Sequence, residues 1–413
     1  MSEAHAHRAI ETVWRLESPR LIAALIRVVR DIDLAEELAQ DALVAALEHW
    51  PAEGVPDNPG AWLMTAAKRR GIDQLRRRQL IERKHAAMDP EDEAFVMPNL
   101  EALDDDIGDD LLRLIFTACH PALSAEAQIA LTLRLLGGLT TEEIARAFLT
   151  PEPTIAQRIV RAKRTLARAN IAYEVPRGDE LGKRLAAVLG VIYLIFNEGY
   201  AATSGGDWMR PALCEEALRL GRTLAALMPR EPEAHGLLAL MEIQASRQRA
   251  RTAPDGAPVL LMVQNRALWD PLLIHRGLAG LERAQQLGGA GGPYALQAAI
   301  AACHARAARA EDTDWKRIAA LYARLAQATP SPVVELNRAV AVGMADGPAA
   351  ALALVDALRD EPALSRYHLL PAVRGDLLEK LGRTDEARAE FTRAAGLAGN
   401  ERERRLMLER AAK

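Results

Sequence analysis

Residues 137–168 read GGLTTEEIARAFLTPEPTIAQRIVRAKRTLAR, and this stretch decides what kind of fold the chain can adopt. Thr140 precedes Glu143 by three residues, the spacing of a capping box, which predicts a helix that begins near Thr141. Pro151 and Pro153 follow a short break and suit the first turn of another helix. The pattern therefore predicts two short helices joined by a tight turn.

The second of these helices has one apolar side and one cationic side. Its apolar residues recur at spacings of four, three and four, which is one stripe of a helix. They are Ile155, Ile159, Ala162 and Leu166. Residues 154–168 also contain five basic residues and no acidic one. Such a helix can pack on its partner and face phosphate, as in a DNA-binding helix-turn-helix. A solvated basic surface helix is the alternative.

The composition favours an all-α protein with more than one domain. The chain has 413 residues, of which 50% are hydrophobic and only 4% aromatic, and a chain of this length forms roughly two to four domains. The net charge of −4 hides a strong asymmetry, because residues 89–110 contain ten acids and no base. The distribution of charge therefore says more about partners than its sum does.

The cysteines and the hydropathy of the chain indicate its cellular compartment. Cys119, Cys214 and Cys303 are far apart and form no CxxC pair, so we expect a reduced, cytoplasmic protein without a metal site. The first residues lack the layout of a secretory signal. The most apolar run, residues 185–196, is about half as long as a membrane span. We therefore expect no membrane segment.

Four segments follow one another along the chain. Residues 8–80 are expected to form one helical domain, with a helix capped by Asp33 and Glu36 that ends near Trp50 and a loop at 51–60. Residues 81–108 are acidic and aperiodic and are interpreted as a flexible linker. The helix-turn-helix belongs to a domain at 109–172. From 180 to 413 the sequence predicts helix after helix.

The last third of the chain contains a weak repeat. The first copy has Ala350, Leu354 and Ala357, and the second has Ala387, Phe391 and Ala394. The offset of 37 residues is close to the period of the tetratricopeptide helical hairpin. Residues 381–391, LGRTDEARAEF, match the turn between the two helices of that repeat. We expect a hairpin array with a groove for a protein or peptide partner. Within it, residues 195–208 (IFNEGYAATSGGDW) are interpreted as a connecting loop, with a ligand or interdomain contact as the alternative.

Two more helices of the first domain carry contrasting charge. Residues 61–84 contain eight Lys or Arg residues against Asp73 and Glu82, with Trp62 near the start. Such a helix can lie along phosphates while aromatic groups stack on unpaired bases, although a nonspecific basic surface is equally compatible. The helix at 33–50 is expected to carry four polar residues outward, as a docking surface for a basic partner or as a solvated face. They are Glu36, Glu37, Gln40 and Asp41.

In this order the segments resemble the bacterial RNA polymerase sigma factors of the extracytoplasmic-function (ECF) class. The region 2 pattern of that family is matched at Glu37, Leu38, Gln40 and Asp41, and again at Trp62, Leu63, Ala67, Asp73, Arg76 and Arg77. The region 4 pattern is similar to Glu143, Ile144, Ala145, Thr154, Ile155, Arg158, Arg161 and Ala162. Arg69 stands where the family usually has Asn, and Leu47 where Trp is common. The long C-terminal half resembles a subgroup with a tetratricopeptide-like extension, which typically lacks a dedicated membrane anti-sigma partner.

The resemblance implies three sets of contacts. The acidic helix would dock on the clamp helices of the largest subunit of core RNA polymerase through Glu36, Glu37, Gln40 and Asp41. The opened −10 element of promoter DNA would be held by Trp62, Lys68, Arg69, Arg70, Arg76 and Arg77. The −35 element would be read by Thr154, Gln157, Arg158, Arg161, Lys163, Arg164 and Arg168. The acidic linker would follow the RNA path of the polymerase, and the extension would modulate activity.

Other functions remain open at this point. A helix-turn-helix regulator with a helical sensor domain would bind duplex DNA without polymerase, and a non-catalytic scaffold would use the repeats alone. An enzyme is disfavoured, because the sequence contains no nucleophile elbow, phosphate-binding glycine loop or metal-ligand spacing. We therefore expect no catalytic, cofactor-binding or metal-binding residue.

Overall fold

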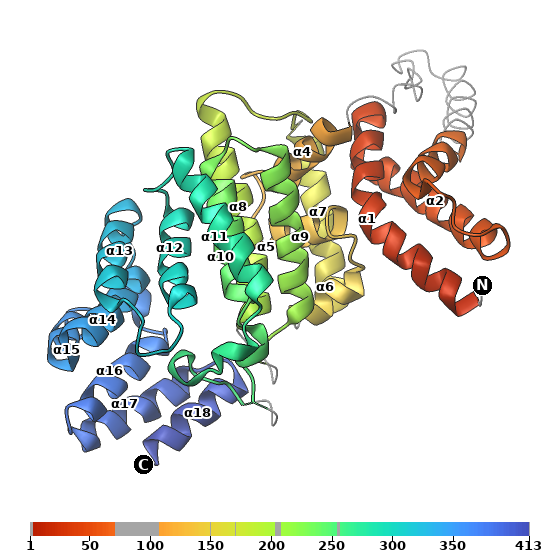
Figure 1. Ribbon diagram of the computed structural model, residues 1–413. Helices are drawn as coiled ribbons and strands as arrows, with labels where there is room; N and C mark the ends of the chain where they lie inside the picture. Colours follow the sequence, from red (N-terminus) through yellow and green to blue (C-terminus); the bar gives the residue numbers. More distant parts are fainter. Residues whose placement is uncertain are drawn as a thin grey trace. The chain divides into compact units, whose positions relative to one another are not determined.

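The computed structural model describes residues 3–70, 107–148, 150–169, 171–202, 208–253 and 257–412. Within these ranges the chain is helical and contains no strand, only an isolated β-bridge between Thr252 and Pro258 (Figure 1). This confirms the all-α prediction. The chain divides into two compact units, Met1–Val191 and Ile192–Lys413, and the boundary falls inside helix α8 (Asp179–Tyr200). None of the described helices combines the length and hydropathy that crossing a membrane requires.

The first unit is built from seven helices in its described part, besides the start of α8. Six of them are α1 (Glu3–Val29), α2 (Ile32–Glu53), α4 (Ile107–Ala118), α5 (Ala125–Leu135), α6 (Thr141–Ala147) and α7 (Glu152–Arg168), and the seventh covers residues 59–70. Only Arg30 and Asp31 join α1 to α2, so the two helices pack side by side, and α4 packs on α1. The largest fully buried side chains of this layer include Leu25, Leu38 and Trp50.

The helix boundaries near residues 31–59 differ from the prediction. The N-cap of α2 is Asp31 and not Asp33, because the Leu34 amide donates to Asp31 Oδ1 at 3.0 Å. At its other end α2 continues through Pro51 to Glu53. The next helix begins at residue 59, where Asn58 Oδ1 accepts from the Ala61 amide at 3.1 Å. The loop is therefore shorter than the stretch 51–60. Most of the predicted linker, 81–106, lies outside the described residues, whereas 107–108 begin α4.

The second unit consists of successive helical hairpins, as the repeat predicts. Its α-helices are α9 (Pro211–Leu227), α10 (Pro232–Ala245), α11 (Pro271–Gln286), α12 (Pro293–Arg306), α13 (Trp315–Ala328), α14 (Pro332–Asp346), α15 (Pro348–Asp356), α16 (Leu369–Lys380), α17 (Thr384–Leu397) and α18 (Glu401–Ala411). Neighbours in sequence pack on each other, most extensively α10 with α11, α16 with α17 and α13 with α14.

The hairpin of α16 and α17 explains why glycine stands at positions 375 and 382. A Cβ on Gly375 would lie 2.8 Å from the Phe391 ring, so only glycine lets the two helices approach this closely. Gly382 adopts φ +75°, the left-handed conformation that ends a helix at low cost. One interpretation from the sequence was wrong: residues 195–200 are not a loop but the last turns of α8.

Candidate nucleic-acid interface

The helix-turn-helix has the geometry that the sequence predicts. The Glu143 amide donates to Thr140 Oγ1 at 3.1 Å, and the Thr140 amide donates to Glu143 Oε2 at 2.8 Å, so both bonds of the capping box are present at the start of α6. Pro153 lies in the first turn of α7, where its missing N–H costs nothing. These local signals fix where the two helices begin.

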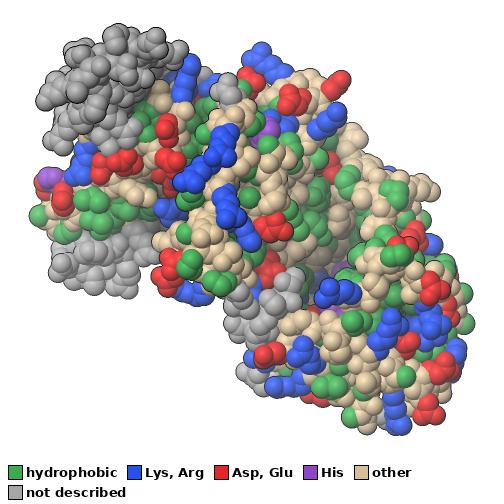
Figure 2. Space-filling view, turned by 180° about the vertical axis from the view of Figure 1, so that it is seen from behind, with side chains coloured by type: hydrophobic (Ala, Val, Ile, Leu, Met, Phe, Trp, Pro, Cys, Tyr) green, Lys and Arg blue, Asp and Glu red, His purple; other side chains and the backbone are tan. Residues whose placement is uncertain are grey.

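The apolar stripe of α7 is buried against α5 and α6. Its members are the four residues that the spacing singled out, Ile155, Ile159, Ala162 and Leu166. The exposed side of the helix carries five of the predicted −35 residues: Thr154, Gln157, Arg161, Arg164 and Arg168. Arg158 is half-buried. Figure 2 shows Lys and Arg side chains gathered across the middle of the face seen from behind, where α7 lies. The pattern leaves a cationic surface free for an anionic partner.

Lys163 differs from the other basic residues of α7. Its side chain is only 12% exposed, its Nζ lies 2.7 Å from Asp33 Oδ1, and it forms a second, close ion pair with Glu36. Burial alone would lower the pKa of Lys163, but the two carboxylates outweigh burial and raise it. In this form of the chain Lys163 therefore binds α2 and is not available to phosphate.

The same contact corrects the prediction for Glu36. We expected this residue to point outward, but it is 7% exposed and accepts a hydrogen bond from Arg134 Nε at 3.1 Å in addition to the lysine contact. Its face of α2 is turned toward the helix-turn-helix domain, and two cations compensate its burial. Local spacing could not predict that Glu36 is buried, because the cation that pairs with it, Arg134, is 98 residues further along the chain.

The remaining residues of the predicted docking surface are accessible. Glu37 and Gln40 are exposed, and Asp41 is partly exposed. Asp41 Oδ1 lies 3.7 Å from Arg70, which also contacts Glu48 at 3.4 Å. Arg70, expected to bind the −10 element, is therefore paired with the acidic helix in this structure.

The predicted −10 residues are only partly described. Trp62 is half-buried and packs edge-to-face on Trp50, with ring centroids 5.3 Å apart. Lys68 is partly exposed and Arg69 is exposed. Arg76 and Arg77 lie outside the described residues. Trp62 thus has a structural role against the core and keeps part of its surface accessible.

A second cluster, which the sequence did not reveal, also joins the two ends of this unit. The Tyr173 hydroxyl lies 2.9 Å from the carbonyl oxygens of Ala23 and Asp110. Arg27 Nε donates to Asp110 Oδ2 at 2.7 Å, and that carboxylate is fully buried. Burial raises the pKa of Tyr173, so its hydroxyl keeps its proton. The segment after α7 therefore holds α1 and α4 together.

Neither metal binding nor thiol chemistry is indicated by the described residues. They contain no group of three or more His, Cys, Asp or Glu side chains placed to hold a metal ion. Cys119, Cys214 and Cys303 are free and buried, and burial raises the pKa of the Cys119 thiol to about 12, which makes it a poor nucleophile. The exposed cationic face of α7 remains the strongest feature of the unit.

Comparison with known proteins identifies three families that match parts of the chain. Residues 13–81 match the family described as sigma-70 region 2, residues 113–166 match sigma-70 region 4, and residues 184–285 match a family of unknown function, DUF6596. The chain is 46% identical over 391 residues to "Uncharacterized protein R00370" of Rhizobium meliloti (strain 1021), covering 92% of this chain and 90% of that protein. No solved structure matches the chain.

Other relatives match a shorter stretch of the chain. The "ECF RNA polymerase sigma factor SigK" of Mycobacterium bovis (strain BCG / Pasteur 1173P2) is 28% identical over 169 residues, which is 39% of this chain and 86% of that protein. The SigK of Mycobacterium ulcerans (strain Agy99) is 27% identical over 155 residues, 36% of this chain and 78% of that protein. The chain contains both sigma-70 regions, followed by a long helical part, so it belongs to the RNA polymerase sigma factors of the ECF class, in a form with a C-terminal helical extension.

Proposed function

We propose that this chain recruits core RNA polymerase through α2, holds the opened −10 element with the helix that begins at residue 59, and reads the −35 element with α7. The observation that carries the proposal is the exposed cationic face of α7, set on a helix whose other face is fully packed. The partners would be core polymerase and promoter DNA, which places the protein in the cytoplasm.

Contacts at the −35 element follow from side-chain chemistry. Gln157 and Arg161 lie one turn apart on the exposed face and have the donors and acceptors that read base edges in the major groove. Arg164 and Arg168 continue the face and suit phosphate. Removing one phosphate contact should reduce the salt dependence of binding by a slope of about 0.9.

Contacts with polymerase would use the accessible part of α2. Glu37, Gln40 and Asp41 supply acidic and polar groups for the basic partner that the resemblance implies, the clamp helices of the largest subunit. Glu36 is buried in the free chain, so it would become available only if α2 and α7 separate.

Separation of α2 and α7 is required by the length of a promoter. The −10 and −35 elements are about 25 base pairs apart, which is roughly 85 Å of duplex at 3.4 Å per base pair. Lys163 on α7 is in direct contact with Asp33 and Glu36 on α2. We infer that this closed form belongs to the free protein, and that binding to polymerase and promoter opens it.

Run-off transcription with purified core polymerase tests the proposal. We expect transcripts from one defined start with the wild-type chain and loss of these transcripts in an Arg161→Ala, Arg164→Ala double variant. A Glu215→Gln variant, altered in the second unit, is the control. Promoter binding without polymerase, and no transcript with it, would instead support the conventional helix-turn-helix regulator.

The role proposed for the extension is modulation of this activity. A chain truncated after residue 175 would retain both sigma-70 regions but lose the second unit and all of α8, including Arg184, which donates to the Phe116 carbonyl at 2.8 Å. We expect the truncation to change the level of transcription from the same start. An unaltered level would mean that the extension does not modulate initiation.

A further inference from the structure

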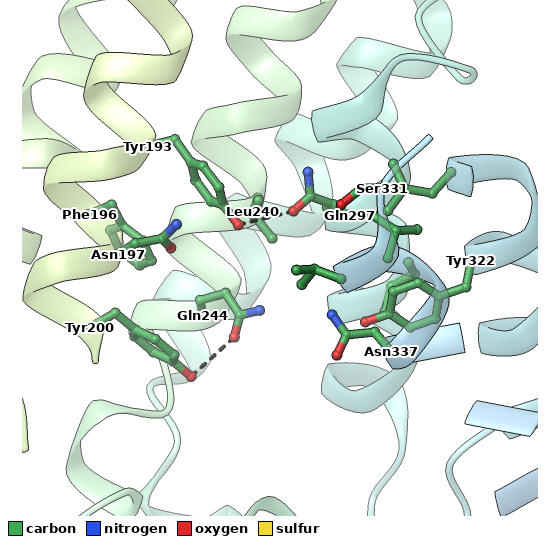
Figure 3. A pocket seen from close by; sticks show the side chains of 14 residues that line it. Tyr193, Phe196, Asn197, Tyr200, Leu240, Gln244, Gln297, Tyr322, Ser331 and Asn337 are labelled. Carbon is green, nitrogen blue, oxygen red and sulfur yellow. Dashed lines mark hydrogen bonds between the residues drawn. The ribbon is translucent and has the colours of Figure 1, made fainter. Parts of the chain in front are cut away.

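The second unit contains a pocket that the proposed promoter interface does not use. Its volume is about 370 Å³, within the range of roughly 300–1,000 Å³ that is typical of small-molecule sites. Side chains from α8, α10, α12, α13 and α14 line it (Figure 3). One wall comes from residues 193–200, which include the start of the IFNEGYAATSGGDW stretch.

The lining is polar but uncharged. None of the described residues that line the pocket is acidic or basic. Four carboxamides come from four different helices, and three tyrosines and several aliphatic side chains fill the space between them. The carboxamides are Asn197, Gln244, Gln297 and Asn337. A charged ligand would lose its hydration here without a counter-charge on the lining, so the lining favours a neutral one.

Some of these polar groups are already paired, and others are not. The Tyr193 hydroxyl contacts Gln297 Oε1, and the Tyr200 hydroxyl contacts Gln244 Oε1, both at 3.1 Å. The carboxamides of Asn197 and Asn337 and the hydroxyl of Tyr322 have no hydrogen-bond partner among the described residues. Asn337 is exposed, and Asn197 and Tyr322 are partly exposed, so these groups are accessible to a ligand.

Two of the unpaired groups and the Gln244 carboxamide face a common space. Figure 3 shows the Asn337 carboxamide and the Tyr322 hydroxyl on one side of the pocket and the Gln244 carboxamide facing them from the other side. Burial raises the pKa of Tyr322 to about 12, so its hydroxyl is a donor at neutral pH. Phe196 and Tyr200 stack on each other with ring centroids 5.6 Å apart and contribute aromatic edges to the lining.

We propose that this pocket binds a small, neutral ring compound that carries an amide-like edge, with a hydrogen-bond donor beside an acceptor. A carboxamide presents one donor next to one acceptor, so its best complement is a second group of the same kind, which forms two parallel hydrogen bonds. The aliphatic and aromatic side chains between the carboxamides suit the apolar body of the ring. This site goes beyond promoter recognition and does not depend on it.

One feature near the pocket favours a competing class of ligand. Arg247 does not line the pocket, but it donates to the Tyr200 hydroxyl at 2.6 Å and also contacts Gln244. Its charge lies directly behind the polar wall and would attract an anion. Comparing the neutral and the anionic form of the same ring therefore shows whether the pocket prefers a neutral ligand or an anion.

The test uses the full-length chain and matched probe pairs. Binding of nicotinamide, benzamide and uracil at millimolar concentration is measured by ligand-observed NMR, with nicotinate and benzoate as the anionic partners of the first two. We expect the neutral probes to bind and the anions to bind at least tenfold more weakly. Asn337→Ala, at an exposed position of α14 that should not affect folding, and Tyr322→Phe should each weaken binding about tenfold.

Gln285→Ala is the matched control, because Gln285 is an exposed carboxamide on α11 outside the pocket. It should bind the probes like the wild type. The proposal is overturned if none of the three neutral probes binds, if the anions bind as tightly, or if Asn337→Ala and Tyr322→Phe behave like the control. Because no DNA or polymerase is present, any of these results leaves the proposed promoter function untouched.

Discussion

At the scale of single residues, Glu36 connects the helix proposed to bind polymerase with the helix proposed to bind DNA. It lies on the helix proposed to bind polymerase, yet in the free protein it contacts Lys163 of the helix proposed to bind DNA, and Arg134 as well. The neighbouring Glu37 is exposed. Two adjacent glutamates of the same helix therefore have different surroundings: Glu36 holds the closed form, and Glu37 is the one that we propose to contact polymerase.

This difference predicts unequal effects of two conservative substitutions. Glu36→Gln leaves Lys163 and Arg134 without their buried counter-charge, so we expect the first unit to lose about 1–3 kcal/mol, less than the cost at a fully buried pair because Arg134 remains a quarter exposed. Glu37→Gln, at an exposed site, should change stability by less than about 0.5 kcal/mol. Native-state hydrogen exchange of α2 and α7 measures both, and equal effects would contradict the structural role of Glu36.

His304 gives the extension a pH dependence at acidic pH. Burial, together with the charges of Arg247 and Arg266, lowers the pKa of His304 to about 4, so the folded form holds it neutral while the unfolded chain takes up a proton below about 6.5. The extension should therefore lose about 2–4 kcal/mol as the pH falls from 7 to 4. Hydrogen exchange of α12 measures this loss, which His304→Gln should remove. His275→Gln, at an exposed histidine, should not.

At the scale of the element, local sequence signals were sufficient to predict the helix-turn-helix formed by α6 and α7. The capping box, the proline-containing first turn and the buried stripe of α7 all depend on residues within four positions of one another, and all are present. The cap of α2 was misassigned because Asp31 and Asp33 are both good cap residues and the spacing alone does not distinguish them; in the structure Asp31 caps the helix and Asp33 pairs with Lys163. The end of α8 was misread because its glycine and polar residues look like a loop.

The capping box predicts the energetic contribution of one threonine. Thr140→Ala removes the acceptor for the Glu143 amide and should destabilise α6 by about 1 kcal/mol. Because α7 packs on α6, affinity for promoter duplex should fall as well. Thr140→Ser keeps the hydroxyl and is the control. Hydrogen exchange of the first α6 amides provides the measurement, and a serine variant as weak as the alanine variant would show that the methyl group and not the cap is responsible.

At the scale of the whole molecule, the contacts that join distant segments could not be predicted from the sequence. Lys163 and Asp33 are separated by 130 residues and Tyr173 and Ala23 by 150, and no spacing or periodicity relates such positions. The sequence identified the residues of each surface but not which of them are paired in the free chain. Closure is therefore a property of the tertiary structure, and it alone indicates that promoter recognition begins with an opening step.

If α2 and α7 must separate, a chain in which the two helices are covalently linked should be inactive. Cysteines at 33 and 163, joined by a reducible bis-thiol linker long enough to span an aspartate and a lysine side chain, should prevent α2 and α7 from separating. The three native cysteines are buried and should not react. We expect the linked chain to give no run-off transcript with core polymerase and to recover after the linker is reduced. The single variants Asp33→Cys and Lys163→Cys, treated in the same way, should give the same transcript level before and after reduction. A linked chain that initiates normally would mean that α2 and α7 stay together on the promoter, and that the −35 element is reached by another route.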